Sequence, residues 1–458
     1  MSGSPEPPCE TYDVAVLGAG IAGVAASIFL RRAGRTVVCL DARPYPHQQV
    51  GESLDWSSPG LLRRVGLSTE TLIADQIATY KKKITVCEIG KPPWEASPPA
   101  GIRRSPLRFE TVTLHVDRAA LDQRLYEEAL ALGTTFVWGR VTRVDVDGER
   151  VTGCTSGSNR RIRARWYIDA TGTARLLARR MRVPWTEYGR KKVCLWTYFD
   201  TPPLADGTTF FLDNTEAYLS WIWDIPISPR RTSVGFVVPV ETIQARRREG
   251  ATNTTILRDE LARYARFERL LAAQPEFDVH STSFRPYVTD RVCGVNWFLA
   301  GEAASMPDPL TGNGVTSAIR HARYVADAIQ GAGDGDQIAA AHRRAYSRHV
   351  HRLGHAFNDH IENAIYRPPL RLGLGMPAAT IVYTVFGFFM NAMYARFDPR
   401  GPVRMAAFDL LFAGARLWIA GWTAIASISR RFRRPAHGFG ALPPEPSGRQ
   451  SRTTTERG

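Results

Sequence analysis

The chain has 458 residues, more than the roughly 250–300 that one hydrophobic core usually serves, so at least two packed units are expected. A hydrophobic content of 44% excludes a disordered chain, and six scattered cysteines without a CxxC pair argue against a disulfide framework or a zinc ribbon. The net charge of +15 is spread along the chain without a helix-turn-helix motif or a basic aromatic sheet, which argues against nucleic-acid binding. Residues 1–11 lack the features of a secretion leader, and with the cysteine usage this favours a cytoplasmic protein.

The first elements of the chain predict a βαβ unit. Residues 12–17 are a continuous apolar run typical of a buried strand, residues 18–32 have helical spacing, and residues 36–40 predict a second strand that ends at Asp41. The turn after the first strand has GxGxxG spacing, carried by Gly18, Gly20 and Gly23. Such glycines let the backbone approach a pyrophosphate at the helix N-terminus, and Asp41 is placed to accept a hydrogen bond from a ribose hydroxyl. The unit predicts a dinucleotide site, with a purely structural glycine turn as the alternative.

The remaining elements, in chain order, are further helices and a large sheet. Helical spacing marks residues 118–132. Residues 193–239 alternate in β fashion and are rich in aromatic side chains, which predicts a largely antiparallel sheet on the substrate side. Helical spacing returns at residues 255–273 and 314–329, and a buried strand is predicted at residues 297–300.

Two later segments resemble motifs of the aromatic-hydroxylase-type FAD monooxygenases. Residues 168–172 (IDATG) resemble their DATG turn, with Asp169 and Gly172, and residues 299–303 (LAGEA) resemble their GDA motif. The resemblance implies that FAD is the cofactor and that Glu302 holds its ribityl chain. Three residues at the start of the last predicted helix would present backbone N–H groups to the N1/O2 edge of the flavin: Gly312, Asn313 and Gly314.

Residues 115–118 (HVDR) resemble the segment that, in this family, leads into the helix over the cofactor. It implies that Arg118 is a cation beside the flavin, with an ordinary exposed helix charge as the alternative.

The fold class expected is α/β: a Rossmann-type FAD-binding domain, a mixed, largely antiparallel substrate-binding sheet and a C-terminal helical region. The expected boundaries are 1–80, 108–190 and 281–365 for the three parts of the FAD-binding domain, 81–107 for a substrate-layer excursion, 191–280 for the substrate sheet, 366–434 for the hydrophobic helical region and 435–458 for a disordered tail.

Two further motifs resemble those of the flavin-dependent halogenases. Residues 51–54 read GESL after the second strand, and residues 221–226 read WIWDIP, the family's WxWxIP motif. The resemblance implies that a channel between flavin and substrate is lined by Trp221, Trp223 and Pro226. Because Trp221 and Trp223 alternate along one strand, both rings face the same side, and a pair of core tryptophans is the alternative. Glu52 and Ser53 are expected to contact the flavin or the channel, with a helix N-cap as the alternative for Ser53.

The halogenase resemblance also implies a lysine after the GES segment. Lys82 falls best in register, between Lys81 and Lys83, and a solvated strand edge is the alternative for the triplet. In that family reduced FAD and O2 form a C4a-hydroperoxide that converts halide to hypohalous acid, and the lysine ammonium delivers the halogen to an electron-rich ring. The resemblance therefore implies an enzyme of specialised metabolism, such as antibiotic biosynthesis, with a separate flavin reductase as partner. The expected substrate is a small aromatic molecule, free or bound to a carrier protein.

The halogenases also carry an F..P..S.G pattern before the last flavin helix. The matching positions here depart from it at Met306 and Gly312 and keep Pro309 and Gly314. Two other reactions therefore stay open on the same fold. One is hydroxylation or epoxidation of a lipophilic aromatic or isoprenoid substrate, and the other is alkene reduction of the geranylgeranyl-reductase type.

Two remaining features of the chain bear on metals and membranes. Four histidines lie close together at 349, 351, 355 and 360, but without acidic ligands in register no metal site is expected. The segments 372–395 and 410–429 are strongly apolar and are followed by an arginine cluster. Three interpretations stay open for residues 372–434: interfacial helices that contact a membrane surface, a hairpin anchor, or a buried helical subdomain.

Overall fold

The structure is a computed structural model. It describes residues 9–44, 49–55, 58–90, 92–96, 113–157, 159–204, 206–213, 215, 218–333 and 335–366. The apolar segments after residue 371 and the expected tail therefore lie outside the described residues. Among the described helices, none combines the length and apolar character that crossing a membrane requires.

The first of two large sheets has the Rossmann arrangement expected from the βαβ unit. Its parallel strands are β1 (Cys9–Leu17), β2 (Val37–Asp41), β7 (Thr135–Trp138), β10 (Arg161–Asp169) and β18 (Trp297–Leu299). The hairpin of β8 (Val141–Asp147) and β9 (Arg150–Ser156) extends it in antiparallel fashion. The chain order changes direction at β1, which pairs with β2 on one side and β10 on the other. In open α/β sheets a ligand binds at such a switch point, outside the carboxyl ends of the strands.

Apolar packing explains why three segments far apart in sequence assemble this sheet. The strands β2 and β18 and the C-terminal halves of β1 and β10 are nearly continuous runs of buried residues, as expected for parallel strands covered on both faces. The helices α1 (Ile21–Arg32), α4 (Arg118–Ala131) and α9 (Gly314–Gly331) pack around them, and α1 contacts both of the others. The helix α10 (Ala340–His360) and one π-helical turn, η5 (Ile361–Tyr366), follow.

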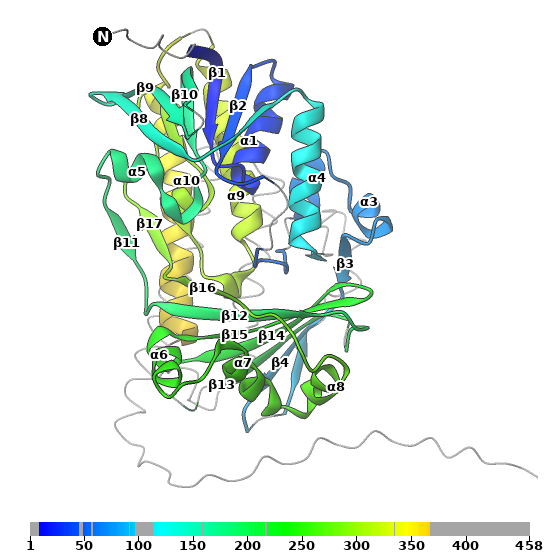
Figure 1. Ribbon diagram of the computed structural model, residues 1–458. Helices are drawn as coiled ribbons and strands as arrows, with labels where there is room; N and C mark the ends of the chain where they lie inside the picture. Colours follow the sequence, from blue (N-terminus) through cyan, green and yellow to red (C-terminus); the bar gives the residue numbers. More distant parts are fainter. Residues whose placement is uncertain are drawn as a thin grey trace, which may run out of the picture.

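The second large sheet is mixed and largely antiparallel, as expected. Its strands in spatial order are β16 (His280–Phe284), β12 (Lys192–Phe199), β15 (Arg231–Pro239), β14 (Ser220–Ser228), β13 (Thr208–Asp213), β4 (Ile84–Glu88) and β5 (Trp94–Ala96). Only the pairing of β13 with β4 is parallel. Figure 1 shows this sheet below the first one, with α6 (Val240–Arg248), α7 (Asn253–Ala262) and α8 (Ala265–Ala273) on its lower side.

Alternation along the strands gives the second sheet two apolar faces. Ile222 packs with the helices below, whereas Trp221 and Trp223 pack on the opposite face with Leu212 and Phe284. The prediction that both tryptophan rings face the same side is confirmed. The upper face is therefore available to form one wall of a site, while the lower face forms a closed core.

The smaller elements connect the two sheets. They are β3 (Ala78–Lys81) with β6 (Thr113–Val116), β11 (Trp185–Glu187) with β17 (Tyr287–Thr289) and β19 (Ser305–Met306), and the helices α2 (Ser58–Arg64), α3 (Thr69–Ala74) and α5 (Leu176–Arg180). Three short 3-10 turns complete the described elements: η2 (Gly172–Ala174), η3 (Gly301–Ala303) and η4 (Pro309–Thr311).

Two elements depart from the local sequence pattern. The helix expected at residues 255–273 is interrupted, because Tyr264 is extended between α7 and α8 and packs its ring 4.8 Å from that of Phe211. The strand β14 runs through Pro226 to Ser228, because a bulge between these two residues lets the ladder include a proline, which has no N–H. In both places tertiary packing overrides the local pattern.

Candidate active site

A cavity of about 370 Å³ lies between the two sheets. Most of its lining comes from the turns after β1, β10 and β18, the segment 49–55, the upper face of the second sheet, and the loop 306–315. The cavity thus begins at the switch point of the first sheet and ends at the aromatic face of the second. Such a location is where an α/β fold of this type binds its ligands.

The three glycines of the first turn have three different functions. Gly18 has φ +103°, and a Cβ there would lie 2.3 Å from the carbonyl oxygen of Ala170, so the turn packs directly on the end of β10. A Cβ on Gly23 would lie 1.9 Å from the carbonyl oxygen of Gly18, so this glycine allows α1 to pack against the turn. Gly20 lines the cavity, and a Cβ there would meet no atom within 4 Å. The free space at Gly20 is where a pyrophosphate would approach the backbone.

Two acidic residues of the expected FAD site hold the turns in shape. Asp41 Oδ2 accepts a hydrogen bond from the Ala19 N–H at 2.7 Å, which fixes the glycine turn. Asp169 is fully buried, and its carboxylate accepts hydrogen bonds from the backbone N–H groups of Thr171 and Leu177. Burial raises the pKa of Asp169, and these hydrogen bonds oppose that shift. The cavity itself is lined at this turn by Ala170 and Gly172, while the ribose contact of Asp41 remains a prediction.

Glu302 and Arg118 carry the charges on the flavin side. The Glu302 side chain faces the space of the cavity, and the protein packed around it raises its pKa, an effect that the positive charge of Arg118 opposes. Arg118 is only 7% exposed, so the alternative of an exposed helix charge is wrong. Its guanidinium makes two hydrogen bonds of 3.0 Å to Asp122 and one of 2.9 Å to the carbonyl oxygen of Val50. This cation is thereby held at the start of α4, against the cavity.

The loop before α9 and the GES segment lie against each other. Gly312 has φ +62°, and a Cβ there would lie 2.7 Å from the carbonyl oxygen of Ser53. Asn313 and Gly314 follow at the N-terminus of α9 and line the cavity. Backbone N–H groups at this helix start could therefore face an anionic ring edge, as the sequence predicts.

Glu52 and Ser53 both line the cavity, but their surroundings differ. Glu52 is 1% exposed, and its Oε1 accepts hydrogen bonds from Tyr198 Oη at 3.0 Å and Ser233 Oγ at 3.2 Å. Burial raises the pKa of Glu52, while hydrogen bonds to the carboxylate oppose this shift. Ser53 forms a β-bridge with His115, five residues before α2 begins at Ser58, so the N-cap interpretation of Ser53 is wrong.

The three lysines after β3 have different positions. Lys82 has a side chain that is 65% exposed and forms a surface ion pair with Asp206 at 3.2 Å, which places it away from the cavity. Lys81 lines the cavity, and its Nζ donates a hydrogen bond to Ser53 Oγ at 3.0 Å. Burial lowers the pKa of Lys81 from 10.5 to about 8. The register expected from the sequence is therefore wrong by one residue: the lysine that reaches the cavity is Lys81.

The WxWxIP motif contributes its tryptophans but not its proline to the cavity. Trp221 and Trp223 are both 3% exposed, line the cavity and have ring centroids 5.6 Å apart. Trp221 Nε1 donates to Tyr366 Oη at 2.9 Å, and Trp223 Nε1 donates to Ser233 Oγ at 3.0 Å. Pro226 lies in the bulge of β14, where its carbonyl oxygen accepts a hydrogen bond from Thr79, and it is not among the lining residues.

Sequence reasoning missed most of the apolar wall. It consists of Ile84, Val86, Phe210, Leu212, Ile225, Phe284, Leu310, Phe357 and Ile365. Alternation within β13 could have identified Phe210 and Leu212 as neighbours on one face. Residues 357 and 365 carry no such pattern, since the fold of α10 and η5 brings them to the cavity. Among the described residues no cluster of His, Cys, Asp or Glu could hold a metal ion.

The residues present fit a bound FAD. The open backbone at Gly20 suits the pyrophosphate of a dinucleotide, and the cation of Arg118 suits its flavin ring. The cavity continues from there to Gly314. Comparison with known proteins agrees. The sequence profile of the family described as "FAD binding domain" matches residues 11–356. The chain belongs to this family of flavoproteins, and FAD is its cofactor.

Similar proteins narrow the class. A pyrrole-2-carbonyl-[peptidyl-carrier protein] brominase of Pseudoalteromonas luteoviolacea is 25% identical over 350 residues, covering 71% of this chain and 79% of that protein. A menaquinone reductase of Mycolicibacterium smegmatis is 26% identical over 351 residues, covering 72% and 78%. The solved structure of the flavin-dependent brominase Bmp2 superposes with a TM-score of 0.65 at 22% identity, covering 92% of this chain and 98% of that one. The chain is thus similar to flavin-dependent halogenases, and it is an FAD-dependent enzyme of the halogenase and monooxygenase class.

Proposed function

We propose that the protein halogenates an electron-rich aromatic ring. FAD, when bound and reduced, supplies two of the four electrons that reduce O2 to water, and the oxidation of the halide and the aromatic C–H to a carbon–halogen bond supplies the other two. In the overall reaction one O2, one halide ion, one proton and the aromatic C–H, together with reduced flavin, yield the halogenated ring, oxidised flavin and two waters. The oxygen chemistry expected from the family resemblance, and a separate reductase that delivers reduced flavin, are parts of this proposal.

The observation that carries the proposal is the position of Lys81. Its ammonium group lies in the cavity between the GES segment and the aromatic wall, where it donates a hydrogen bond to the neutral hydroxyl of Ser53. Since the pKa of Lys81 is lowered only to about 8, the amine is largely protonated at neutral pH. An ammonium there would donate a hydrogen bond to the oxygen of a hypohalous acid and direct its halogen toward a ring at the aromatic wall. Lys81 is the proposed catalytic residue.

The groups beside Lys81 on the β-bridge are neutral, while the negative charge of Asp55, which also lines the cavity, favours the ammonium form of Lys81. His115, next to Ser53 in the β-bridge, is fully buried and lies 2.8 Å through Nε2 from Thr208 Oγ1. Burial, followed by the charge of Lys81, lowers the pKa of His115 well below its ordinary value, so the imidazole stays neutral. Ser53 and Thr208 are neutral as well. The ammonium is therefore the local positive charge that faces the proposed oxidant.

The apolar wall supports a flat, uncharged ring as the substrate. Trp221 and Trp223 lie on β14, with Phe210 on the neighbouring strand β13 and Phe284 on β16 of the same sheet. Aromatic side chains bind another ring through stacked or edge-on contacts and exclude water from it. The brominase relative acts on a pyrrole ring attached to a carrier protein, so we propose a small aromatic substrate that is free or carried in this way.

The test uses the purified protein with FAD, a flavin reductase, NADH, O2 and bromide or chloride, on free pyrroles and phenols and on a pyrrole-2-carbonyl carrier protein. Mass spectrometry of the products should show a halogen isotope pattern. Lys81→Met should abolish it while FAD binding persists, and the matched control Lys82→Met should leave it intact. A halogenated product from Lys81→Met, or its loss in Lys82→Met, would contradict the assignment of Lys81.

A second candidate function is alkene reduction, which the menaquinone reductase relative favours. The same reduced flavin would then deliver hydride to a carbon–carbon double bond, without O2 or halide. An anaerobic reaction with an isoprenoid quinone and reduced FAD tests it, because a product that still carries two extra hydrogens after reoxidation in air has lost a carbon–carbon double bond, whereas a quinol returns to the quinone. A gain of one oxygen in the aerobic reaction would instead identify a monooxygenase.

A further inference from the structure

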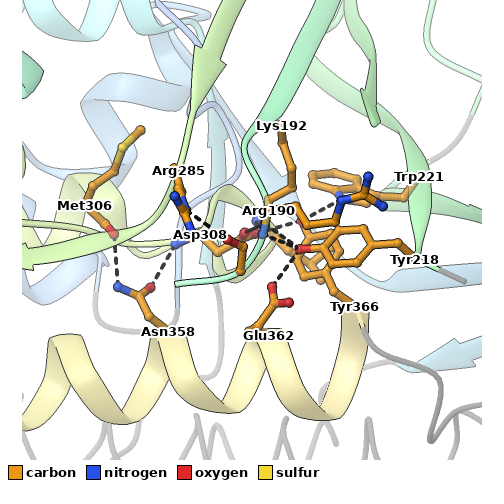
Figure 2. A network of polar contacts seen from close by, with 12 residues as sticks. Arg190, Lys192, Tyr218, Trp221, Arg285, Met306, Asp308, Asn358, Glu362 and Tyr366 are labelled. Carbon is orange, nitrogen blue, oxygen red and sulfur yellow. Dashed lines mark hydrogen bonds and ion pairs between the residues drawn. The ribbon is translucent and has the colours of Figure 1, made fainter. Parts of the chain in front are cut away.

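A buried ion pair joins the second sheet to the loop before α9. Lys192, the first residue of β12, places its Nζ 3.1 Å from Asp308 Oδ2, and each side chain is 1% exposed. Figure 2 shows both residues at the centre of a network between the strands and the last turns of α10 and η5. Asp308 also lines the cavity, so the network reaches the wall of the site.

Two tyrosines whose rings stack on each other, Tyr218 and Tyr366, extend the ion pair. The Lys192 ammonium lies 3.9 Å from the ring centroid of Tyr366 and donates to Tyr218 Oη at 3.3 Å. Tyr366 Oη donates to Asp308 Oδ1 at 3.0 Å and accepts from Trp221 Nε1 at 2.9 Å. Burial raises the pKa of Tyr366 well above its ordinary value, so this hydroxyl keeps its proton. The ion pair is thereby connected to an indole of the aromatic wall.

The carboxylate end of the pair shapes the loop that leads into the flavin side. Asp308 Oδ1 accepts a hydrogen bond from the Leu310 N–H at 3.0 Å and so caps the turn η4 before Gly312. The side-chain amide of Asn358 on α10 holds the loop from outside: it accepts from the Asp308 N–H at 3.3 Å and donates to the carbonyl oxygen of Met306 at 3.1 Å. These contacts determine where the backbone of residues 312–314 enters the cavity.

The other end of the network is packed tightly on the backbone. Tyr218 Oη donates to Glu362 Oε2 at 2.6 Å, and this carboxylate lies so close to Gly189 that a Cβ there would be 1.8 Å from Glu362 Oε2. Lys192 therefore sits between two anchored acceptor groups, Tyr218 on one side and Asp308 on the other. Such packing holds the ammonium in one place.

Stability alone does not account for this pair. Desolvation of two buried charges often costs as much as their attraction gains, so an apolar replacement of similar volume would serve stability as well. What an apolar pair cannot do is hold a loop and an indole at defined hydrogen-bond distances at the same time. The geometry points to a role in alignment.

We propose that Lys192 is a positioning residue that aligns the two walls of the cavity. Through Asp308 it sets the loop 306–314 on the flavin side, and through Tyr366 it sets the indole of Trp221 on the substrate side. A bound FAD and a bound aromatic substrate ring are thus kept at a fixed position relative to each other. Without this alignment FAD binds more weakly, and O2 is reduced to H2O2 instead of serving product formation. The effect on FAD affinity is independent of the halogenation proposal, while the effect on product formation rests on it.

The test compares Lys192→Met with Arg266→Met, measuring FAD affinity by fluorescence titration and the H2O2 released per O2 consumed. Arg266 pairs with the buried Asp224 at 2.7 Å on the lower face of the same sheet, away from the cavity, and is the matched control. Lys192→Met leaves Asp308 buried without its cation, so FAD binding should weaken about tenfold and the H2O2 fraction should rise. Arg266→Met should lower the melting temperature with neither effect.

Two further variants keep the test decisive if Lys192→Met folds poorly. Lys192→Met/Asp308→Asn removes both charges, so the melting temperature should recover while FAD affinity and the H2O2 fraction stay altered. Tyr366→Phe removes one hydroxyl and should raise the H2O2 fraction alone. Wild-type FAD affinity and H2O2 fraction in the folded variants would overturn the proposal. If the wild-type enzyme makes no halogenated product, the FAD titration still decides the role of Lys192.

Discussion

The flavin-side wall of the cavity consists largely of backbone turns, whereas the opposite wall consists of side chains that project from one sheet. On the flavin side Gly18, Gly23 and Gly312 lie where a Cβ would meet backbone atoms at less than 3 Å. On the substrate side Gly235 of β15 makes room for side chains instead, since a Cβ there would lie 2.2 Å from the indole of Trp223 and 2.7 Å from the Cβ of Trp196. Backbone cannot yield locally, but a side chain can rotate. The two walls should therefore respond differently to the same kind of substitution.

The largest effect is expected for Gly23→Ala on the flavin side. Its Cβ would meet the carbonyl oxygen of Gly18 at 1.9 Å, and both atoms belong to packed backbone. We expect a loss of about 3 kcal/mol or more in the free energy of unfolding, at the upper end of the overpacking range. Urea denaturation of the apoprotein measures it.

Gly20→Ala is the matched control for that substitution. Because nothing lies within 4 Å of a Cβ at Gly20, the apoprotein should be as stable as the wild type, while the methyl group would occupy the space of the cofactor. We expect FAD affinity, measured by fluorescence titration, to fall in this variant. If Gly20→Ala binds FAD normally, the pyrophosphate does not lie at this turn.

The next largest effect is expected for the pH dependence of activity, which reports the protonation of Lys81 between the two walls. Its pKa is lowered from 10.5 to about 8, so the ammonium needed for halogen transfer is lost as the pH rises through about 8. Halogenation under saturating reduced FAD should then fall by up to about tenfold for each pH unit above that point. Activity that rises through this range would indicate the neutral amine as the active form.

The same pKa shift has an opposite consequence for stability. The folded state disfavours the charged lysine, so Lys81 costs the apoprotein stability below pH 8, where the side chain is protonated in both states. Between pH 8 and 10.5 the unfolded state binds more protons, and the cost disappears as the pH rises. Relative to Lys81→Met, the wild type should therefore gain melting temperature over this range. A constant difference would mean that Lys81 is fully solvated.

The smallest effect is expected for Gly235→Ala on the substrate side. The new methyl group would press on the Trp223 indole, which can tilt into the cavity and narrow the space for the ring. We expect KM for the aromatic substrate to rise about tenfold, within the usual range for a pocket changed by one methyl group. FAD affinity should not change, and a loss of FAD binding in this variant would remove the distinction between the two walls.

The flavin side was predictable because its motifs are local. Each glycine of the GxGxxG turn, the DATG turn and the loop 312–314 acts within a few residues of a strand end or a helix start, and those are visible in the pattern of the chain. The class of fold and the cofactor follow from the same segments, and both expectations are confirmed. The prediction that Arg118 faces the cofactor was also local, since it depends on the first turn of one helix.

The substrate side depended on contacts between distant segments. Lys81 and not Lys82 enters the cavity because β3 pairs with β6, and this pairing sets which side chains of a four-residue strand point inward. No period can be read from so short a strand. Likewise nothing near Lys192 in the sequence indicates Asp308 as its partner. The backbone turns of the flavin side were already determined by the amino-acid sequence, because these turns depend on residues close together in the chain. The choice between Lys81 and Lys82 and the ion pair of Lys192 with Asp308, in contrast, required the tertiary structure. Only folding determines which distant charges come to lie together away from water.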